Sequence, residues 1–433
     1  MAARTIADVP SPSVTRRAGP QDACPGALRV HQAADGGLAR VRVPGGLLSG
    51  RQWQVLVSAA AELGNGHLEL TSRGNLQLRG LGTDAAESLA GRLTDAGLLP
   101  SLTHERVRNL LASPLSGRDG GGLADVRPLI AEFDQALTSR PALAELSGRF
   151  LFALDDGRAD VLAIGPDIAV TATSSTTVRL LLAGRYAGAP VPIGSAVELM
   201  LAAAEAFLAE RRAQGSDAWR LAELTDGPAR VAARLGLTTS GLPHPTGPAP
   251  APGPLRQSDG RQALVLGIPL GSLNTAQAGV LSAPRLILTP WRSVVLPGLG
   301  TAAAAVLLNA GAAQGLITDG TDPLNGVTAC TGRPGCASAL ADVRADAIAA
   351  HAVAGHAVAA HAVAGHQAEP IAGPVHWSGC SRRCGRPAGT VIDVVATGDG
   401  YRVSSAGRST DVGGSSAQLR VALCDSSNLV AAR

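Results

Sequence analysis

The sequence predicts an α+β protein in which one structural unit occurs twice. Strand-like and helix-like segments alternate near the N-terminus, and short motifs from this region return about half a chain later. The chain has 433 residues, of which 45% are hydrophobic and 16% are charged. This composition can bury more than one core and argues against overall disorder.

The first unit is outlined by sequence period and helix-cap signals. Leu38–Val43 alternates as a strand does, and Ser49 is a suitable N-cap for a helix that places Trp53 and Leu56 on one face. Further strands are expected at 67–70 and 76–79, followed by a helix that is capped by Thr83 and has Asp84 in its first turn. We expect these segments to form one small α+β unit.

The second unit is indicated by three short matches at a nearly constant offset. The later motifs Ile268–Gly271, Leu288–Arg292 and Leu296–Thr301 correspond to Val43–Gly46, Leu70–Arg73 and Leu78–Thr83. Such self-similarity implies a duplication and therefore a pseudo-two-fold molecule. Gly298-x-Gly300 resembles a dinucleotide-binding turn. Because the first unit carries Gly80-x-Gly82 at the same place, we interpret both as the start of a helix.

The remaining segments separate and follow the two units. Residues 106–117 are expected to be a loop, and 238–257, rich in Pro and Gly, a linker. Helices are expected at 125–137, 194–212 and 217–235, and strands at 149–154 and within 161–182.

Two cysteine couples near the C-terminus suggest one soft-metal site. Cys330 and Cys336 have the spacing C-x5-C, and Cys380 and Cys384 have C-x3-C. The longer gap fits zinc poorly, whereas iron–sulfur clusters accept more varied spacings. We therefore predict a [4Fe-4S] cluster in a reducing, cytoplasmic compartment. The alternative is that the four cysteines are unrelated, buried core residues. For Cys24 and Cys424, a role as free thiols in the core is the expected one.

Composition excludes several classes of function. The chain has no lysine, so all 37 basic residues are arginines, which rules out Schiff-base and P-loop lysines. A net charge of +3 and 2% aromatic residues give little support for nucleic-acid binding. No apolar run approaches the roughly 20 residues of a membrane span, and no export signal is recognised.

Histidine recurs every fifth residue from His351 to His366. At 100° per residue, this spacing turns successive histidines by about 140° around a helix, so they do not share one face. We therefore expect an expanded repeat in a loop or helix extension and not a metal-binding tract.

The cysteine couples, the duplicated unit and the stretch Leu70–Gly80 (LTSRGNLQLRG) together resemble the sirohaem-dependent nitrite and sulfite reductases. Within that superfamily the precorrin-3B synthase branch is the most similar, because the segments Ala23–Gly26 and Val41–Gly46 look like its beginning. The resemblance runs from about residue 22 to about residue 396 and implies paired ferredoxin-like half-domains, each followed by an α/β reductase-like lobe. The expected division is a disordered lead (1–22), the first half-domain (23–100), the first lobe (101–237), a linker (238–258), the second half-domain (259–318) and the second lobe with the cysteines (319–433).

The resemblance also implies site residues. Cys330, Cys336, Cys380 and Cys384 would hold the [4Fe-4S] cluster, with Cys384 matching the cysteine that bridges to sirohaem iron in the reductases. Substrate-binding residues would be Arg73, Arg108, Asn109 and Arg149. Two lysines of the reductases fall on Arg149 and Leu151, and losing a charged contact costs about 1.5–3 kcal/mol. Small-anion reduction is therefore disfavoured, while a tetrapyrrole pocket can remain.

The implied activity is O2-dependent hydroxylation of precorrin-3A at C20, with closure of the ring A lactone. It calls for an external electron donor and for an iron centre beyond the cluster, a mononuclear non-haem iron. The catalytic residues remain unidentified, and His31, His67, His104 and His376 are iron-ligand candidates by residue type alone. The alternatives are a sirohaem-containing sulfite or nitrite reductase, and an electron carrier or structural metal module.

Overall fold

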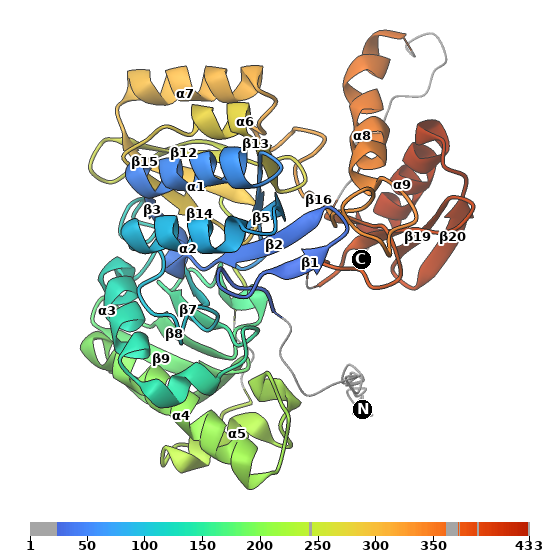
Figure 1. Cartoon of the computed structure of the whole chain (residues 1–433). Coiled ribbons are helices and arrows are strands. Elements are labelled where there is room, and N and C mark those ends of the chain that lie inside the picture. Colours follow the sequence, from blue (N-terminus) through green and yellow to red (C-terminus); the bar gives the residue numbers. More distant parts are fainter. Residues whose placement is uncertain (1–23, 242–244, 361–370, 372, 388, 432–433) are drawn as a thin grey trace, which may run out of the picture.

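The computed structural model describes residues 24–241, 245–360, 371, 373–387 and 389–431. These residues form four five-stranded sheets (Figure 1). Two sheets belong to paired ferredoxin-like half-domains, and the other two each form the centre of a lobe. The fold class is therefore the duplicated α+β arrangement expected from the sequence.

Each half-domain sheet takes its fifth strand from the other half. The first sheet has the order β1-β2-β5-β4-β13, and the second has the order β11-β12-β15-β14-β3. In the first half the elements are β1 (His31–Ala33), β2 (Gly36–Val41), β3 (Leu47–Ser49), α1 (Gly50–Leu63), β4 (His67–Leu70), β5 (Leu76–Leu81) and α2 (Ala85–Asp95). In the second half they are β11 (Gly253–Arg256), β12 (Gln262–Gly267), β13 (Ser272–Asn274), α6 (Thr275–Val280), β14 (Arg285–Leu288), β15 (Ser293–Leu299) and α7 (Thr301–Ala313).

The helix caps repeat the same symmetry. Ser49 and Gln52 form a capping box at the start of α1, and Asn274 and Gln277 form one at the start of α6. The Gln52 side-chain amide also donates to Ala96 O at 3.1 Å, and the Gln277 amide donates to Gln314 O at 3.1 Å. These matched contacts support a pseudo-two-fold relation between the half-domains.

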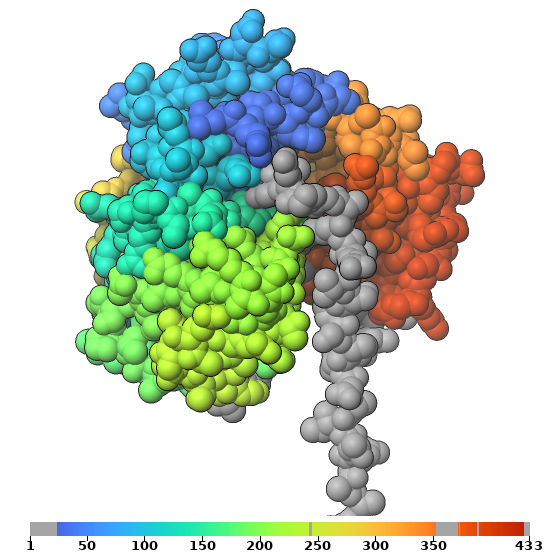
Figure 2. All heavy atoms as spheres, turned by 60° about the horizontal axis from the view of Figure 1, so that its bottom comes forward, coloured from blue at the N-terminus to red at the C-terminus, as the bar shows by residue number. Residues whose placement is uncertain are grey.

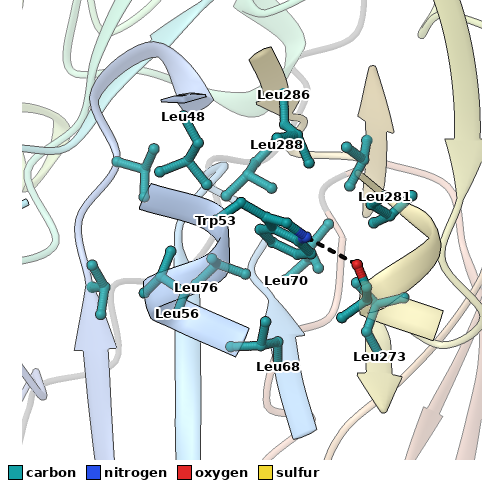
Figure 3. Close-up of a cluster of buried hydrophobic side chains, with 14 of the residues drawn as sticks. Leu48, Trp53, Leu56, Leu68, Leu70, Leu76, Leu273, Leu281, Leu286 and Leu288 are labelled. Carbon is teal, nitrogen blue, oxygen red and sulfur yellow. Dashed lines mark hydrogen bonds between the residues drawn. The ribbon is translucent and has the colours of Figure 1, made fainter. Parts of the chain in front are cut away.

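The two half-domains share one hydrophobic core. Trp53 on α1 is fully buried, and its indole Nε1 donates to Ala278 O on α6 at 3.0 Å (Figure 3). Leucines from both halves surround the ring, among them Leu56, Leu273 and Leu288. Because a buried tryptophan combines a large apolar area with one satisfied donor, this contact fixes the pairing of the halves.

The two lobes have the same strand pattern. In each, three parallel strands are extended by two antiparallel ones. The first lobe contains β6 (Leu110–Ala112), α3 (Arg127–Thr138), β7 (Phe152–Asp155), β8 (Ile168–Ala172), β9 (Thr177–Leu182), β10 (Arg185–Pro192), α4 (Ala196–Ala213) and α5 (Gly227–Arg234). The second contains β16 (Val327–Ala329), α8 (Val343–Ala360), β17 (Val375–Ser378), β18 (Ile392–Ala396), β19 (Tyr401–Ser405), β20 (Arg408–Val412) and α9 (Ser416–Ala431). Short 3-10 turns occupy Pro44–Gly46, Pro141–Glu145, Leu162–Ile164, Ile193–Ser195 and Leu221–Glu223.

The lobes form separate masses beside the first half-domain. Figure 2 shows the first lobe in green and the second lobe in orange and red, with the first half-domain in blue and cyan above them. The β1–β2 hairpin extends from the half-domains towards the second lobe (Figure 1). Among the described helices, none has the length and apolar character needed to cross a membrane.

Three expectations about local structure need correction. The segment 106–117 is not wholly a loop, because it contains β6, and the linker 238–257 ends in β11. Only Gly227–Arg234 of the predicted helix 217–235 is α-helical, after a short 3-10 turn. The interpretation of Gly298-x-Gly300 as the start of a helix is in contrast correct, because α7 follows Gly300 and the strand before it is antiparallel to both neighbours, unlike the parallel strand of a dinucleotide-binding unit. The predicted lead (1–22) lies outside the described residues, and the domain limits stay predictions.

Candidate functional site

A cavity of about 430 Å³ lies where both half-domains meet the second lobe. A second cavity, of about 670 Å³, lies beside it. The two cavities share five of their lining residues, namely Arg40, Gln77, Cys330, Thr331 and Cys384. The two cavities are therefore parts of one hollow. We call the cavity of about 430 Å³ the arginine cavity and the cavity of about 670 Å³ the cysteine cavity.

One wall of the arginine cavity is a polar row across the first half-domain sheet. The strand register places Arg40 opposite Gln77, and Gln77 opposite Glu69. Arg40 Nε donates to the Gln77 side-chain oxygen at 3.0 Å, and the Gln77 amide donates to Glu69 at 3.1 Å. Because side chains alternate along a strand, the neighbouring Leu68 and Leu78 point into the core and this row faces the cavity.

The second lobe closes the cavity with Arg344 from α8. The Arg344 guanidinium pairs with Glu69 at 2.7 Å and donates to Cys330 O at 3.3 Å. This contact links the polar row of the first half-domain to the first cysteine couple. Since Glu69 is buried, the ion pair also neutralises a carboxylate that would be costly to bury alone.

Three arginines of the cavity have no such partner. Arg73, Arg149 and Arg292 line it, and none of them pairs with a carboxylate among the described residues. Burial, and then the charges of Arg220 and Arg149, lower the pKa of Arg73 to about 10. Burial, followed by the charge of Arg344, lowers the pKa of Arg292 to about 10. The cavity therefore carries excess positive charge that an anionic ligand would stabilise.

The four predicted cluster cysteines all line the cysteine cavity. Cys330 follows β16, and its backbone N–H donates to Trp377 O at 2.9 Å. The Gly379 N–H donates to Cys330 Sγ at 3.1 Å. The parallel pairing of β16 and β17 thus brings the two cysteine couples together at the carboxyl ends of neighbouring strands.

The first cysteine couple is held against the β1–β2 hairpin. Arg79 pairs with Asp35 at 2.8 Å and donates to Gly335 O at 2.7 Å. Arg333 Nε donates to Ala339 O at 2.8 Å. Since Arg79 is buried, it connects the first half-domain firmly to the loop that carries Cys336.

The four cysteine thiols lie near enough to one another for their charges to interact. Burial and the charges of the other three thiols raise the pKa of Cys384, so the four groups act on one another electrostatically. Within the described residues, no group of three or more His, Cys, Asp or Glu side chains could hold one metal ion. One ion needs donors about 2–2.3 Å from a single point, whereas a four-iron cluster takes four cysteine ligands on its separate irons. The same finding leaves the expected mononuclear iron without a ligand set in this part of the chain.

Arg108 and Asn109 do not line either cavity. Arg108 is buried, with both oxygens of Asp134 at 2.7 Å and Leu98 O at 2.9 Å. Asn109 donates to Gly148 O at 2.9 Å and accepts from the Asn75 amide at 3.1 Å. Their hydrogen bonds are satisfied inside the protein, so these contacts position the cavity wall and do not face a ligand.

Of the four histidine candidates, His31 lines the cysteine cavity with the four cysteines, whereas His67 is exposed at the start of β4. His376 on β17 is fully buried, and its Nδ1 lies 2.8 Å from the Thr328 hydroxyl. Burial and then the charge of Arg292 lower the pKa of His376 to about 3, so it is neutral at physiological pH. His104 contacts Arg140 O at 3.0 Å, far along the chain from the cysteines. His351 on α8 packs edge-on against Trp377 on β17, while the repeat beyond residue 360 lies outside the described residues.

Sequence reasoning missed Arg40, Glu69, Gln77, Arg292 and Arg344 as cavity residues. The alternation Arg40-Val41-Arg42 within a strand was a usable signal for Arg40. Arg292 ends the motif that repeats Leu70–Arg73, so its place in the second copy of this turn was a usable signal, although it falls one position later than Arg73. Arg344 and Glu69 carried no local signal, because their pairing joins residues 275 positions apart.

Comparisons with known proteins agree on one relationship. Residues 31–96 match the nitrite/sulfite reductase ferredoxin-like half domain. A precorrin-3B synthase from Sinorhizobium sp is 28% identical over 393 residues, which are 88% of this chain and 81% of that protein. A ferredoxin–nitrite reductase from Leptolyngbya laminosa is 31% identical over 123 residues, 27% of this chain and 24% of that protein.

A solved structure extends the likeness to the fold. The structure of the Mycobacterium tuberculosis NirA protein matches with a TM-score of 0.68 and 21% identity, over 86% of this chain and 77% of that one. The comparisons thus confirm the resemblance that the motifs indicate: the chain is similar to precorrin-3B synthase, within the nitrite and sulfite reductase superfamily.

Proposed function

We propose that this chain is a precorrin-3B synthase-like monooxygenase of aerobic cobalamin biosynthesis. It hydroxylates precorrin-3A at C20 with O2 and forms the ring A lactone. The similarity over 88% of the chain supports this role. The observation that carries it is the arginine cavity, in which Arg73, Arg149 and Arg292 have no carboxylate partner among the described residues.

The charge of the cavity suits a tetrapyrrole substrate. Precorrin-3A carries eight carboxylates, and arginine binds a carboxylate through two parallel hydrogen bonds. Each charged hydrogen bond contributes about 1.5–3 kcal/mol net. The continuous hollow offers room beyond the arginine cavity itself, because the cysteine cavity adjoins it. A macrocycle held by carboxylates at its rim would present one meso carbon towards the cysteine side.

The same geometry disfavours small-anion reduction. Of the two positions that hold lysines in the reductases, Arg149 lines the cavity, whereas Leu151 is buried among Leu111, Ala153 and Leu181. The site therefore lacks the second cation and proton donor at that place. The remaining arginines can bind carboxylates but provide no acid that titrates near neutral pH.

Cys330, Cys336, Cys380 and Cys384 would hold a [4Fe-4S] cluster, which supplies single electrons when bound. The chain's own contribution is to bind the substrate carboxylates and orient the macrocycle. It also holds the cysteine loops through Arg79 and Arg344. One oxygen atom of O2 enters the product, and the other leaves as water after two electrons arrive from an external donor.

The decisive experiment is incubation of the iron-reconstituted protein with precorrin-3A, a reductant and O2. We expect a product with one added oxygen atom by mass spectrometry, and the added mass should follow isotopically labelled O2. Recovery of unchanged precorrin-3A by a protein with a full iron–sulfur content would refute the proposal.

The sirohaem-dependent reductase is tested by the same preparation. Its basis is the 31% identity to a ferredoxin–nitrite reductase, which covers only 27% of this chain. A sirohaem reductase shows sirohaem bands in its visible spectrum and consumes nitrite or sulfite. A brown iron–sulfur spectrum without those bands, together with no anion consumption, excludes it.

A further inference from the structure

Two turns with the same hydrogen bonds reach the arginine cavity, one from each half-domain. In the turn after β4, the Thr71 N–H donates to Asn75 O at 2.9 Å, and Thr71 Oγ1 accepts from the Asn75 N–H at 3.1 Å. In the turn after β14, Thr289 and Ser293 make the equivalent bonds at 2.9 and 3.2 Å. The first turn supplies Arg73 and the second supplies Arg292, so each copy of the turn delivers a guanidinium to the cavity, from adjacent and not equivalent positions.

The backbone at Arg292 has an unusual conformation for an arginine. Its φ is +56°, and the equivalent position in the first turn is Gly74, with a φ of +63°. A left-handed backbone is uncommon for a residue with a side chain, because it is strained, and such strain is often found at functional sites. The second turn therefore places a long cation where the first turn has no side chain.

A glycine next to Arg292 leaves room for its side chain. Gly271 also has a positive φ, of +76°, and a Cβ there would lie 2.3 Å from Arg292 Cδ. The Arg292 stem therefore crosses bare backbone. Its Nη2 then donates to Gly385 O at 3.1 Å, and the residue is only 8% exposed. The guanidinium is thus fixed beside the loop that carries Cys384.

The charges around Arg292 compensate it only in part, because it makes no ion pair among the described residues. Arg344 is the cation that acts most strongly on it, and the opposing charge of Glu69 has the smaller effect because Glu69 is already paired with Arg344. The charges that act on Arg73 belong to other residues, chiefly Arg220 and Arg149. The excess positive charge is therefore divided between two places, one on the first-lobe side and one beside the cysteines.

We infer that Arg292 forms a second carboxylate-binding subsite, on the cysteine side of the arginine cavity, which holds one rim carboxylate of the tetrapyrrole while Arg73 and Arg149 hold others. This inference rests on the proposed function and adds the residue that sets the orientation of the macrocycle. Because Arg292 also contacts Gly385 O, a carboxylate bound there acts on the Cys384 loop.

The test uses uroporphyrin III, an air-stable macrocycle with eight carboxylates, as the probe. Its fluorescence quenching is titrated against the iron-reconstituted protein and against the variants Arg292→Gln and Arg292→Lys. We expect the Gln variant to bind about ten- to hundredfold more weakly, as for loss of a charged hydrogen bond. The Lys variant should recover part of the affinity. Arg402→Gln, which removes an exposed ion pair on β19, is the matched control and should bind within twofold of the wild type.

A second readout separates ligand contact from a structural role. In the wild type, uroporphyrin III should shift the electron paramagnetic resonance signal of the reduced cluster, and in the Gln variant this shift should be lost while the iron content is unchanged. Gly271→Ala, which crowds the Arg292 stem, should weaken binding in the same direction. If the Gln variant fails to fold, the Lys variant and Gly271→Ala carry the test, and wild-type affinity in both contradicts the inference.

Failure of the inference and failure of the proposed function give different results. If the wild type does not bind uroporphyrin III, the tetrapyrrole role itself is wrong. If the wild type binds it and Arg292→Gln binds equally well with the same spectral shift, the second subsite is wrong and the tetrapyrrole role stands.

Discussion

Replacing Arg108 by methionine should destabilise the protein and leave ligand binding unchanged. The Arg108 side chain is 4% exposed and makes bonds of 2.7 Å to both oxygens of Asp134 and of 2.9 Å to Leu98 O. Methionine keeps the aliphatic stem but loses these bonds. Removing one partner of a buried ion pair costs about 3–5 kcal/mol. Because the Asp134 side chain is 22% exposed and water can reach it, we expect about 2–3 kcal/mol.

The assay is urea unfolding of the wild type, Arg108→Met, Asp134→Leu and the double variant. Since removing both partners leaves no buried charge unpaired, the double variant should lose less stability than the sum of the single variants. Uroporphyrin III affinity, measured at a urea concentration where all four proteins are folded, should agree within twofold.

The opposite pattern would refute the structural role of Arg108. An Arg108→Met variant that unfolds at the same urea concentration as the wild type, but binds uroporphyrin III tenfold more weakly, would make Arg108 a direct ligand contact. That result would restore the role that the sequence resemblance assigned to it.

Three further predictions test the cluster, the fold and a buried acid. Cys336→Ser should lower bound iron and sulfide and bleach the brown absorption, whereas Cys24→Ser, at the edge of the arginine cavity, should retain both. Trp53→Ala should cost about 3–5 kcal/mol in the free energy of unfolding, with both half-domains losing structure in one transition by circular dichroism. Burial raises the pKa of Asp160 to about 7, from 3.8 in the unfolded chain. The folded state therefore binds the extra proton between these values, and stability should fall as pH rises from about 4 to 7, by at most about 4 kcal/mol. Burial also raises the pKa of Asp155 and of Asp167, so Asp160→Asn should reduce this slope without abolishing it in unfolding measurements at several pH values, and an unchanged slope would show that Asp160 does not contribute.

Local signals in the sequence predicted much of the fold. The strand at 67–70 and the helix after Ser49 follow from alternation and capping, and the structure has both. The strand β6 was missed because three residues within a loop-like segment carry too little pattern. The pairing of β13 with β4 and of β3 with β14 could not be inferred, because short strands of three residues do not specify a distant partner.

The sequence predicted those site residues whose motifs place them on the wall of a cavity. Cys330 and Cys384 each belong to a closely spaced cysteine couple that can be recognised without a structure, and both line the hollow. Arg73 lies in a turn and reaches the cavity, whereas Arg108 precedes β6 and turns inward to Asp134. Adjacency to a motif does not fix side-chain direction. For Arg108, the buried ion pair with Asp134 sets the direction of the side chain.

The exchange of β3 and β13 has a consequence for how the chain originated and folds. Two separate copies of the half-domain, each lending a short strand to the other, would form a homodimer with the same contacts. The present chain has the arrangement of such a dimer within one polypeptide. Its central contact, from Trp53 to Ala278, closes a loop of 225 positions. Because such distant contacts must form before either sheet is complete, the paired half-domains should fold late and as one cooperative unit.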